Sequence, residues 1–317
     1  MEKKKVFIDG SEGTTGLRIF ERFEGRNDIE ILKIDSELRK DPEEISKFMN
    51  ASDVTFLCLP DAAAIEAVPL CTNPDTIIID TSTAHRTTEG WLYGFPELDK
   101  EHRDALLTSK RIANPGCHAS GFVSLVYPLV KKGIISADTR LCSFSLTGYS
   151  GGGKKKIAEY QAQERDPELF SPRQYGLSQN HKHLKEMQMI CGLNKAPLFS
   201  PIICDFYSGM EVSVYLYKEM FNEAVTPGYI NEFYKSYYEG SKLVKVAKLG
   251  IEEELGGFIG SNNLSGKDYL EIIVTGNEDR IIVTSRLDNL GKGASAAAIQ
   301  NMNIALGFEE TAGLVTE

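Results

Sequence analysis

The stretch KVFIDGSEGTTG (Lys5–Gly16) joins a short apolar run to a turn that holds Gly10, Gly13 and Gly16. The apolar run predicts a buried strand, and the glycines predict a tight turn that leads into a helix. N–H groups at a helix N-terminus attract phosphate, so the stretch predicts dinucleotide binding, to which the hydroxyls of Thr14 and Thr15 would add donors. The spacing GxxGxxG differs from the commoner GxGxxG, so this prediction depends on the pattern that follows.

Strand patterns alternate with helical patterns as far as residue 80. The strands are expected at residues 29–35, 53–60 and 75–80, and the helices at residues 14–25, 41–50 and 61–70. This rhythm predicts an α/β protein with an N-terminal Rossmann-type doubly wound parallel sheet.

The pattern changes after Gly121. Long strand candidates follow at residues 139–149, 196–206 and 210–218, and a hairpin is expected at 269–290. The second half is therefore expected to be α+β, with a mixed or antiparallel sheet. Pro128 lies inside a helical pattern and should kink or end that helix.

The composition limits the class of protein. A chain of 317 residues favours two domains, and a net charge of −10 argues against nucleic acid or anionic membrane as the main partner. No apolar stretch has the length of a membrane span. The six cysteines form no CxxC pair and show no zinc spacing, so we expect no metal site. The same cysteine usage predicts a protein of the reducing cytoplasm.

RIANPGCHASG (Arg111–Gly121) places Cys117 at a sharp strand-to-helix turn. The helix dipole would lower the pKa of a thiol there, and the N–H groups of the turn would form an oxyanion hole. The pattern predicts a nucleophile, and the alternative is a buried small residue near a domain junction.

Two of the five histidines lie together in NHKHLKEM (residues 180–187). On a helix, Glu186 would share a face with His183 and could orient its ring as an acid/base, whereas His181 has no such partner. The alternative is a hydrophilic helix start. The other three histidines, at positions 85, 102 and 118, are expected to be surface or capping groups.

TGYSGGGKKK (residues 147–156) is a candidate anion site. Ser150, Gly151 and Gly152 could fold into a nest of backbone N–H groups beside Lys154, and the alternative is a mobile solvated loop. A nucleotide site, a poised thiol and a second anion site together predict an oxidoreductase that acts through a thioester on a phosphorylated acyl group.

The end of the second expected strand should contact the adenosine ribose. Asp35 favours a free 2′-OH there, whereas Ser36, Arg39 and Lys40 favour a 2′-phosphate. The residues alone leave the choice between NAD and NADP open.

At these motifs the sequence resembles the N-acetyl-γ-glutamyl-phosphate reductases of arginine biosynthesis, in particular their shorter, second type. The resemblance implies a Rossmann domain at residues 1–116, a catalytic and dimerisation domain at 117–292, and a C-terminal helix over 293–317 that packs back on the first domain. The stretches that carry it are GSEGTTG (10–16), DTSTAHR (80–86), YGFPEL (93–98), ANPGCHASG (113–121), TGYSGGGKK (147–155), NHKHLKEM (180–187) and NLGKGASAAAIQNMNIALG (289–307).

The resemblance also implies reduction of N-acetyl-γ-glutamyl phosphate by NADPH to N-acetylglutamate semialdehyde and phosphate. Cys117 falls on the nucleophile of the family, and the HKHLKE stretch falls on its catalytic histidine, with Lys185 in place of the usual proline. Arg86 is expected to contact the substrate carboxylate or phosphate, on its charge alone, and Asn114 is a further substrate candidate. Pro60 is expected to border the NADP site.

Two other functions remain open. One is an aspartate-semialdehyde dehydrogenase, which uses the same thioester chemistry but has N-C-T/S around its cysteine. The other is a non-catalytic NADP-binding redox sensor, which would not need the second anion loop or the His–Glu pair. We expect a homodimer or homotetramer, and the sequence does not decide between His181 and His183 as the acid/base.

Overall fold

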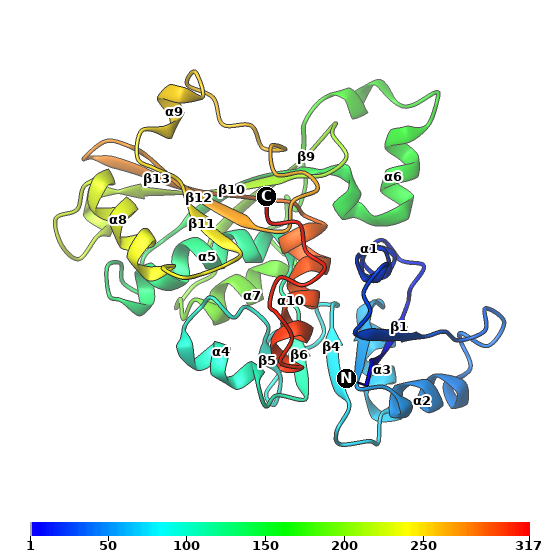
Figure 1. Cartoon of the computed structure of the whole chain (residues 1–317). Helices are drawn as coiled ribbons and strands as arrows, with labels where there is room; N and C mark the ends of the chain where they lie inside the picture. The colour runs from blue at the N-terminus through cyan, green and yellow to red at the C-terminus, as the bar shows by residue number, and fades with distance from the viewer. Residues whose placement is uncertain (1) are drawn as a thin grey trace. The chain divides into compact units, whose positions relative to one another are not determined.

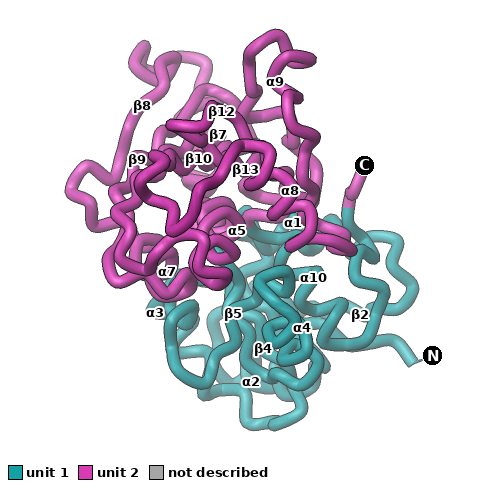
Figure 2. Tube along the Cα trace, turned by 90° about the vertical axis from the view of Figure 1, so that its left-hand side faces the viewer, with its two compact units in different colours: residues 1–116, 294–314 teal, residues 117–293, 315–317 magenta. Residues whose placement is uncertain are grey.

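The computed structural model describes residues 2–317, so Met1 of the expected first domain lies outside the described residues. Two compact units divide the chain (Figure 2). Unit 1 comprises residues 1–116 and 294–314, and unit 2 comprises residues 117–293 and 315–317. Gly293 and the last three residues therefore belong to unit 2, although the sequence placed them with the first domain.

Unit 1 contains a six-stranded sheet in the order β2-β1-β3-β4-β6-β5, with parallel pairing throughout. Its strands are β1 (Lys4–Asp9), β2 (Ile29–Leu32), β3 (Val54–Leu57), β4 (Ile77–Asp80), β5 (Leu92–Tyr93) and β6 (Arg111–Ala113). β1 has β2 on one side and β3 on the other, so the strand order reverses between β1 and β3. Such a switch point is where doubly wound sheets bind ligands, at the carboxyl ends of the strands.

Helices cover both faces of this sheet (Figure 1), which confirms the doubly wound architecture. The helices of unit 1 are α1 (Thr14–Phe23), α2 (Pro42–Ala51), α3 (Asp61–Ala67), α4 (Lys100–Leu106) and α10 (Ala296–Ala305). Alternate residues of β1 serve the two cores: Val6 packs with Ile19 and Met302, whereas Phe7 packs with Met49. The expected C-terminal helix over 293–317 is wrong in extent, because α10 covers ten residues after a π-helical turn, η5 (Gly291–Ser295).

Unit 2 contains a seven-stranded mixed sheet in the order β11-β12-β13-β10-β7-β9-β8. Its strands are β7 (Cys142–Gly148), β8 (Arg173–Gln174), β9 (Leu198–Cys204), β10 (Met210–Tyr217), β11 (Val244–Val246), β12 (Leu270–Gly276) and β13 (Arg280–Leu287). β12 and β13 form the expected hairpin, closed by the N–H of Asn277 bonded to the carbonyl of Arg280 at 2.8 Å.

The long helix α5 (Cys117–Lys131) packs against β10 and β13. A Cβ at Gly121 would lie 2.5 Å from Val212 Cγ2, so glycine is required for this close packing. The other helices of unit 2 are α6 (Gly153–Gln161), α7 (His183–Ile190), α8 (Pro227–Tyr237) and α9 (Ile251–Glu254). None of the helices within residues 2–317 is long and apolar enough to cross a membrane.

Pro128 does not end α5, which continues to Lys131. A proline at this position has no N–H for the carbonyl of Ser124, one turn earlier. The hydroxyl of Tyr238 donates to that carbonyl at 2.6 Å, and the hydroxyl of Tyr234 donates to the next carbonyl, that of Leu125, at 2.6 Å. Two tyrosines at the C-terminal end of α8 thus satisfy the backbone that the proline disturbs.

Candidate active site

The glycine-rich turn has no room for side chains. Gly10 has a φ of +81°, and a Cβ there would lie 2.3 Å from the carbonyl oxygen of Cys58, just past β3. A Cβ at Gly16 would lie 2.5 Å from the carbonyl oxygen of Gly10. Gly13 is the N-cap of α1 and makes no side-chain cap bond to the first N–H groups of the helix. Thr14 and Thr15 begin the helix. The turn therefore brings a helix N-terminus to the switch point, which suits the pyrophosphate of a dinucleotide.

The ribose candidates lie in turns after β2. The N–H of Glu37 donates to Oδ1 of Asp35 at 2.9 Å, so one carboxylate oxygen of Asp35 already has a hydrogen-bond partner two residues away. Arg39 forms an ion pair with Glu12, a residue of the glycine-rich turn, and both side chains are exposed. Ser36 and Arg39 both lie in a turn, and the ion pair with Glu12 holds Arg39 beside the glycine-rich turn.

Buried polar groups gather where β1, β3 and β4 end. Burial raises the pKa of Asp9 to about 6, and burial together with the charges of Asp9 and Asp80 raises the pKa of Cys58 to about 12. His85 is 8% exposed, bonds Asp80 through Nδ1 at 2.6 Å and stacks on Trp91 at 4.0 Å. The surface assignment of His85 was therefore wrong. Pro60 directly precedes α3, two residues after Cys58.

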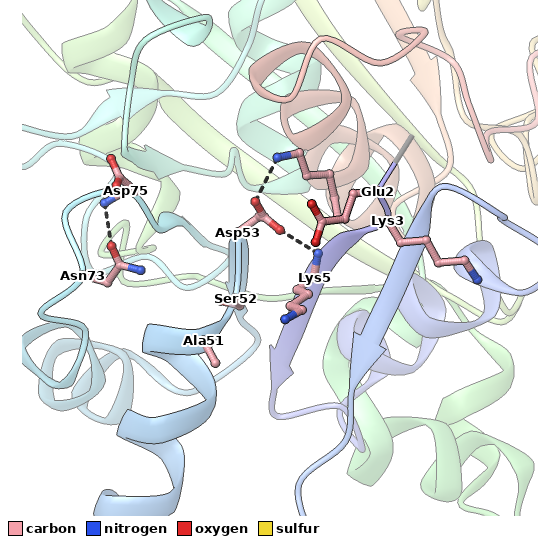
Figure 3. Close-up of a pocket in the computed structure, with 9 residues that line it drawn as sticks. Glu2, Lys3, Lys5, Ala51, Ser52, Asp53, Asn73 and Asp75 are labelled. Atoms are coloured by element: carbon pink, nitrogen blue, oxygen red, sulfur yellow. Dashed lines mark hydrogen bonds and ion pairs between the residues drawn. The ribbon is translucent and has the colours of Figure 1, made fainter.

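A hollow of about 290 Å³ lies at the opposite, amino ends of β1 and β3 (Figure 3). Asp53 binds the Nζ of Lys4 at 3.0 Å and the N–H of Lys5 at 2.8 Å there. Doubly wound sheets bind their ligands at the carboxyl ends of the strands, so this hollow is not the cofactor candidate.

The turn before Cys117 is tightly held. Asn114 is 1% exposed, and it donates its N–H to the carbonyl of Asp80 at 2.8 Å and its Nδ2 to the carbonyl of Ala294 at 2.9 Å. Arg86 is also buried and donates to the carbonyls of Asn114, at 2.8 Å, and of Thr81, at 3.1 Å. These bonds fix the backbone of the turn, and a contact of Arg86 or Asn114 with substrate stays a prediction.

Cys117 is the first residue of α5 and is partly exposed. A Cβ at Gly293, in η5, would lie 2.8 Å from the Cβ of Cys117. Only a glycine therefore lets η5 pass this close to the first residue of α5. π-Helical turns are frequent at functional sites, and this one lies against the candidate nucleophile.

Three histidines of unit 2 cluster together. The ring centroids of His181 and His183 are 4.8 Å apart, and that of His118 is 5.8 Å from the first and 5.6 Å from the second. Burial lowers the pKa of His118 to about 3 and that of His181 to about 4. His118 was expected at the surface or in a cap and is instead 3% exposed. His102, by contrast, bonds Asp99, which caps α4.

Both ring nitrogens of His118 have partners. Nδ1 lies 2.7 Å from the Oγ of Ser145 on β7, and Nε2 lies 2.7 Å from the hydroxyl of Tyr175. Burial raises the pKa of Tyr175, and the charge of Cys117 raises it further. Serine, histidine and tyrosine thus form one hydrogen-bonded chain beside the candidate nucleophile.

Glu186 is 2% exposed and lies one turn after His183 in α7. Burial raises the pKa of the Cys191 thiol well above its usual range, and the charge of Glu186 raises it further. The negative charge of Glu186 thus acts on the Cys191 thiol. Whether Glu186 also orients the His183 ring stays a prediction.

The segment around Ser150 is a short 3₁₀ turn, η2 (Tyr149–Gly152), that leads into α6. Ser150 donates its N–H to the carbonyl of Tyr207 at 3.0 Å, and its Oγ accepts from Asn289 Nδ2 at 2.9 Å. The N–H of Ser150 is therefore not part of the expected anion nest. Gly151, Gly152 and Lys154 are exposed, so an anion site there stays a prediction.

Comparison with known proteins identifies the family. "Semialdehyde dehydrogenase, NAD binding domain" matches residues 4–106, and "Semialdehyde dehydrogenase, dimerisation domain" matches residues 117–289. N-acetyl-γ-glutamyl-phosphate reductase 2 of Nostoc sp. is 41% identical, over 99% of this chain and 100% of that protein. The reductase 2 of Pseudomonas putida is 37% identical, with the same coverage. The chain belongs to the N-acetyl-γ-glutamyl-phosphate reductase family. It is therefore an oxidoreductase with a nicotinamide-dinucleotide-binding domain.

Solved structures share the fold of this reductase family member. Aspartate semialdehyde dehydrogenase II of Vibrio cholerae, in complex with ASA, has a TM-score of 0.71 at 14% identity, over 97% of this chain and 99% of its own. The enzyme of Francisella tularensis has a TM-score of 0.72 at 14% identity, over 95% and 99%. At this identity the likeness concerns the fold alone.

Sequence reasoning missed four residues of this reductase's candidate site, His118, Ser145, Tyr175 and Gly293. His118 follows Cys117 directly, and the helix start of CHASG was a usable signal that its ring could turn inward. Ser145 and Tyr175 offered no signal, because they lie 27 and 57 residues from His118 in sequence. Within residues 2–317, no group of three or more histidine, cysteine or acidic side chains is arranged to hold a metal ion.

Proposed function

We propose that the chain catalyses the NADPH-dependent reduction of N-acetyl-γ-glutamyl phosphate to N-acetylglutamate 5-semialdehyde and phosphate, in arginine biosynthesis. The observation that carries the proposal is Cys117 at the first position of α5, in the same unit as the cluster of His118, His181 and His183. A thiol at a helix N-terminus is suited to nucleophilic attack. Relatives of 41% and 37% identity carry the name of this reductase.

The chemistry begins at Cys117. Its thiolate attacks the acyl carbon, a C–S bond forms, and the C–O bond to phosphate breaks with its electron pair leaving on the phosphate. N–H groups of the first turn of α5, which have no partner within the helix, hold the oxyanion. When bound, a nicotinamide cofactor would supply the hydride that reduces the thioester. His183 or His181 provides the proton for the resulting oxygen and takes it back as the C–S bond breaks and the aldehyde forms.

NADPH is the cofactor we propose over NADH. Asp35 would repel a 2′-phosphate, but it already accepts the N–H of Glu37. Arg39 lies beside the glycine-rich turn through its ion pair with Glu12 and can exchange this exposed carboxylate for a phosphate. Ser36 adds a hydroxyl donor.

An aspartate-semialdehyde dehydrogenase is the second candidate, because solved structures of that enzyme share the fold. The test offers NADP⁺, phosphate and each semialdehyde in turn and follows the formation of NADPH. We expect turnover with N-acetylglutamate semialdehyde and little with aspartate semialdehyde. Faster turnover of aspartate semialdehyde would overturn the proposed substrate, and no turnover with either would favour the redox sensor.

The proposed assembly is a homodimer or a homotetramer, formed through the sheet of unit 2. Val212 on β10 faces α5, so Tyr215, three residues on, faces away from the helix, and Tyr215 is 41% exposed. Ser145 on β7 faces His118, so its neighbours Phe144 and Leu146 also face away, and both are only partly buried. A sheet face with such residues suits a second copy of the chain. We place the enzyme in the cytoplasm because all six cysteines within residues 2–317 remain thiols.

A further inference from the structure

Asn114 has a partner for each of its polar groups. Its N–H donates to the carbonyl of Asp80 at 2.8 Å, which continues the pairing of β6 with β4. Its carbonyl accepts from Arg86 Nε at 2.8 Å. Its Nδ2 donates to the carbonyl of Ala294 at 2.9 Å, and its Oδ1 accepts from Asn301 Nδ2 at 3.4 Å. Because Asn114 is also only 1% exposed, its side chain has no open surface for a substrate.

The residues that follow Asn114 explain its place at the end of the sheet. Pro115 comes next, and a residue before proline favours extended backbone. Pro115 has no N–H, so it cannot continue the pairing of β6 with β4. The chain passes through Gly116, and α5 begins at Cys117. Asn114 therefore anchors the end of the sheet three residues before the thiol.

The loop after β4 brings a charged donor to this anchor. The fully buried carboxylate of Asp80 accepts the N–H and the hydroxyl of Ser82, at 2.9 Å and 2.7 Å, and lies 2.6 Å from His85 Nδ1. Arg86 follows in the same loop and is 8% exposed. Hydrogen bonds from charged donors are stronger than neutral ones, so the bond from Arg86 holds the backbone of Asn114 firmly.

The amide of Asn114 acts where the chain passes between the two units. The chain passes at Gly116–Cys117 and again at Gly293–Ala294. In unit 1, the amide of Asn114 bonds the carbonyl of Ala294. In unit 2, a Cβ at Gly293 would lie 2.8 Å from the Cβ of Cys117. Each unit thus holds its own ends of the two crossings together, unit 1 through Asn114 and unit 2 at Cys117.

We propose that Asn114 is a positioning residue of the reaction, whose side-chain amide, bonded to Ala294, fixes the turn from which Cys117 reacts. This inference rests on the proposed role of Cys117 as the nucleophile. Misplacing a reacting group by about 1 Å can cost about 100-fold in rate. The same bond fixes where α5 begins, and with it the first-turn N–H groups that stabilise a thiolate. Asn114 acts through the turn and does not itself contact the substrate.

The test is Asn114→Ala in the full chain, assayed for kcat, for KM and for the pH dependence of Cys117 alkylation by iodoacetamide. The kcat should fall about 100-fold, while the KM for the acyl phosphate changes little. Alkylation needs no substrate, and the apparent pKa of the thiol should rise by about 0.2–0.7 units as the first turn of α5 loosens. A raised KM with unchanged kcat and unchanged alkylation would overturn the inference, because Asn114 would then bind the substrate.

Asn303→Ala is the matched control. Asn303 lies on α10 in the same unit, is fully buried, and donates its Nδ2 to the carbonyls of Glu310 and Ala312, both at 3.0 Å. Its replacement removes comparable hydrogen bonds and should leave kcat and the alkylation profile unchanged. An equal fall of kcat in this variant would overturn the inference, because any loss of stability in unit 1 would then suffice.

Asn114→Asp provides a second variant that keeps the shape and the Oδ1 acceptor. At about pH 9 its carboxyl is ionised and has no proton to donate to Ala294. Its kcat should therefore fall as in the alanine variant, relative to the wild type at the same pH. A folded Asn114→Asp variant with wild-type kcat and alkylation would overturn the inference while leaving the proposed function intact. Full activity of Cys117→Ala would instead remove the proposed function itself.

Discussion

Tyr238→Phe should weaken the helix that carries Cys117. The phenol is 5% exposed and donates at 2.6 Å to the carbonyl of Ser124, which Pro128 cannot bond. Removing a donor from a buried carbonyl should lower the free energy of opening of α5 by about 1–3 kcal/mol. The amides of α5 should then exchange about 5- to 150-fold faster. Hydrogen exchange resolved along α5 measures this directly and does not require two-state unfolding of a protein with two units.

A double-mutant cycle with Pro128→Ala isolates the cause. The alanine restores an N–H for the carbonyl of Ser124, so Tyr238→Phe should cost less than about 1 kcal/mol in that background. Tyr237→Phe, one residue away, serves as the control. Equal cost of Tyr238→Phe with and without Pro128 would refute the link between the proline and the tyrosine.

The remaining predictions concern the cofactor, the acid/base and the pH dependence. Arg39→Ala should weaken NADPH ~10–100-fold in kcat/KM and barely affect NADH, and equal use of both cofactors by the wild type would contradict the proposed specificity. His183→Asn should lower kcat ~10²–10⁴-fold, and His181→Asn should act mainly on KM; the reverse pattern would exchange the two roles. His118 and His181 have lowered pKa values of about 3 and about 4, so the unfolded chain binds more protons below its histidine pKa of about 6.5. Stability should therefore fall as the pH drops from about 6.5 towards 4, and a flat melting temperature over this range would contradict the burial of the two rings.

The sequence predicts what depends on local chemistry. Gly10 and Gly16 were identifiable because a left-handed φ and a close backbone approach each require glycine, whatever the rest of the fold does. The doubly wound sheet was predictable because each strand and helix pattern can be recognised locally, and their alternation indicates a parallel sheet covered by helices.

Contacts that depend on strand register were not predictable. The bond from His118 to Ser145 requires α5 to lie on β7 with Ser145 facing it, and no pattern in CHASG fixes that. The continuation of α5 past Pro128 depends in the same way on tyrosines more than a hundred residues later. The ion pair between Arg39 and Glu12 of the glycine-rich turn was likewise not predictable, because it joins two loops that no local pattern relates.

The central claim is that the reaction passes through a thioester on Cys117. The purified enzyme is mixed with N-acetylglutamate semialdehyde and NADP⁺ in the absence of phosphate, and NADPH formation and the mass of the Cys117 peptide are followed. The account predicts a single burst of about one NADPH per active site and an N-acetylglutamyl adduct on Cys117 that phosphate then removes. Steady NADPH formation without phosphate, or a burst that persists in Cys117→Ala, would contradict it.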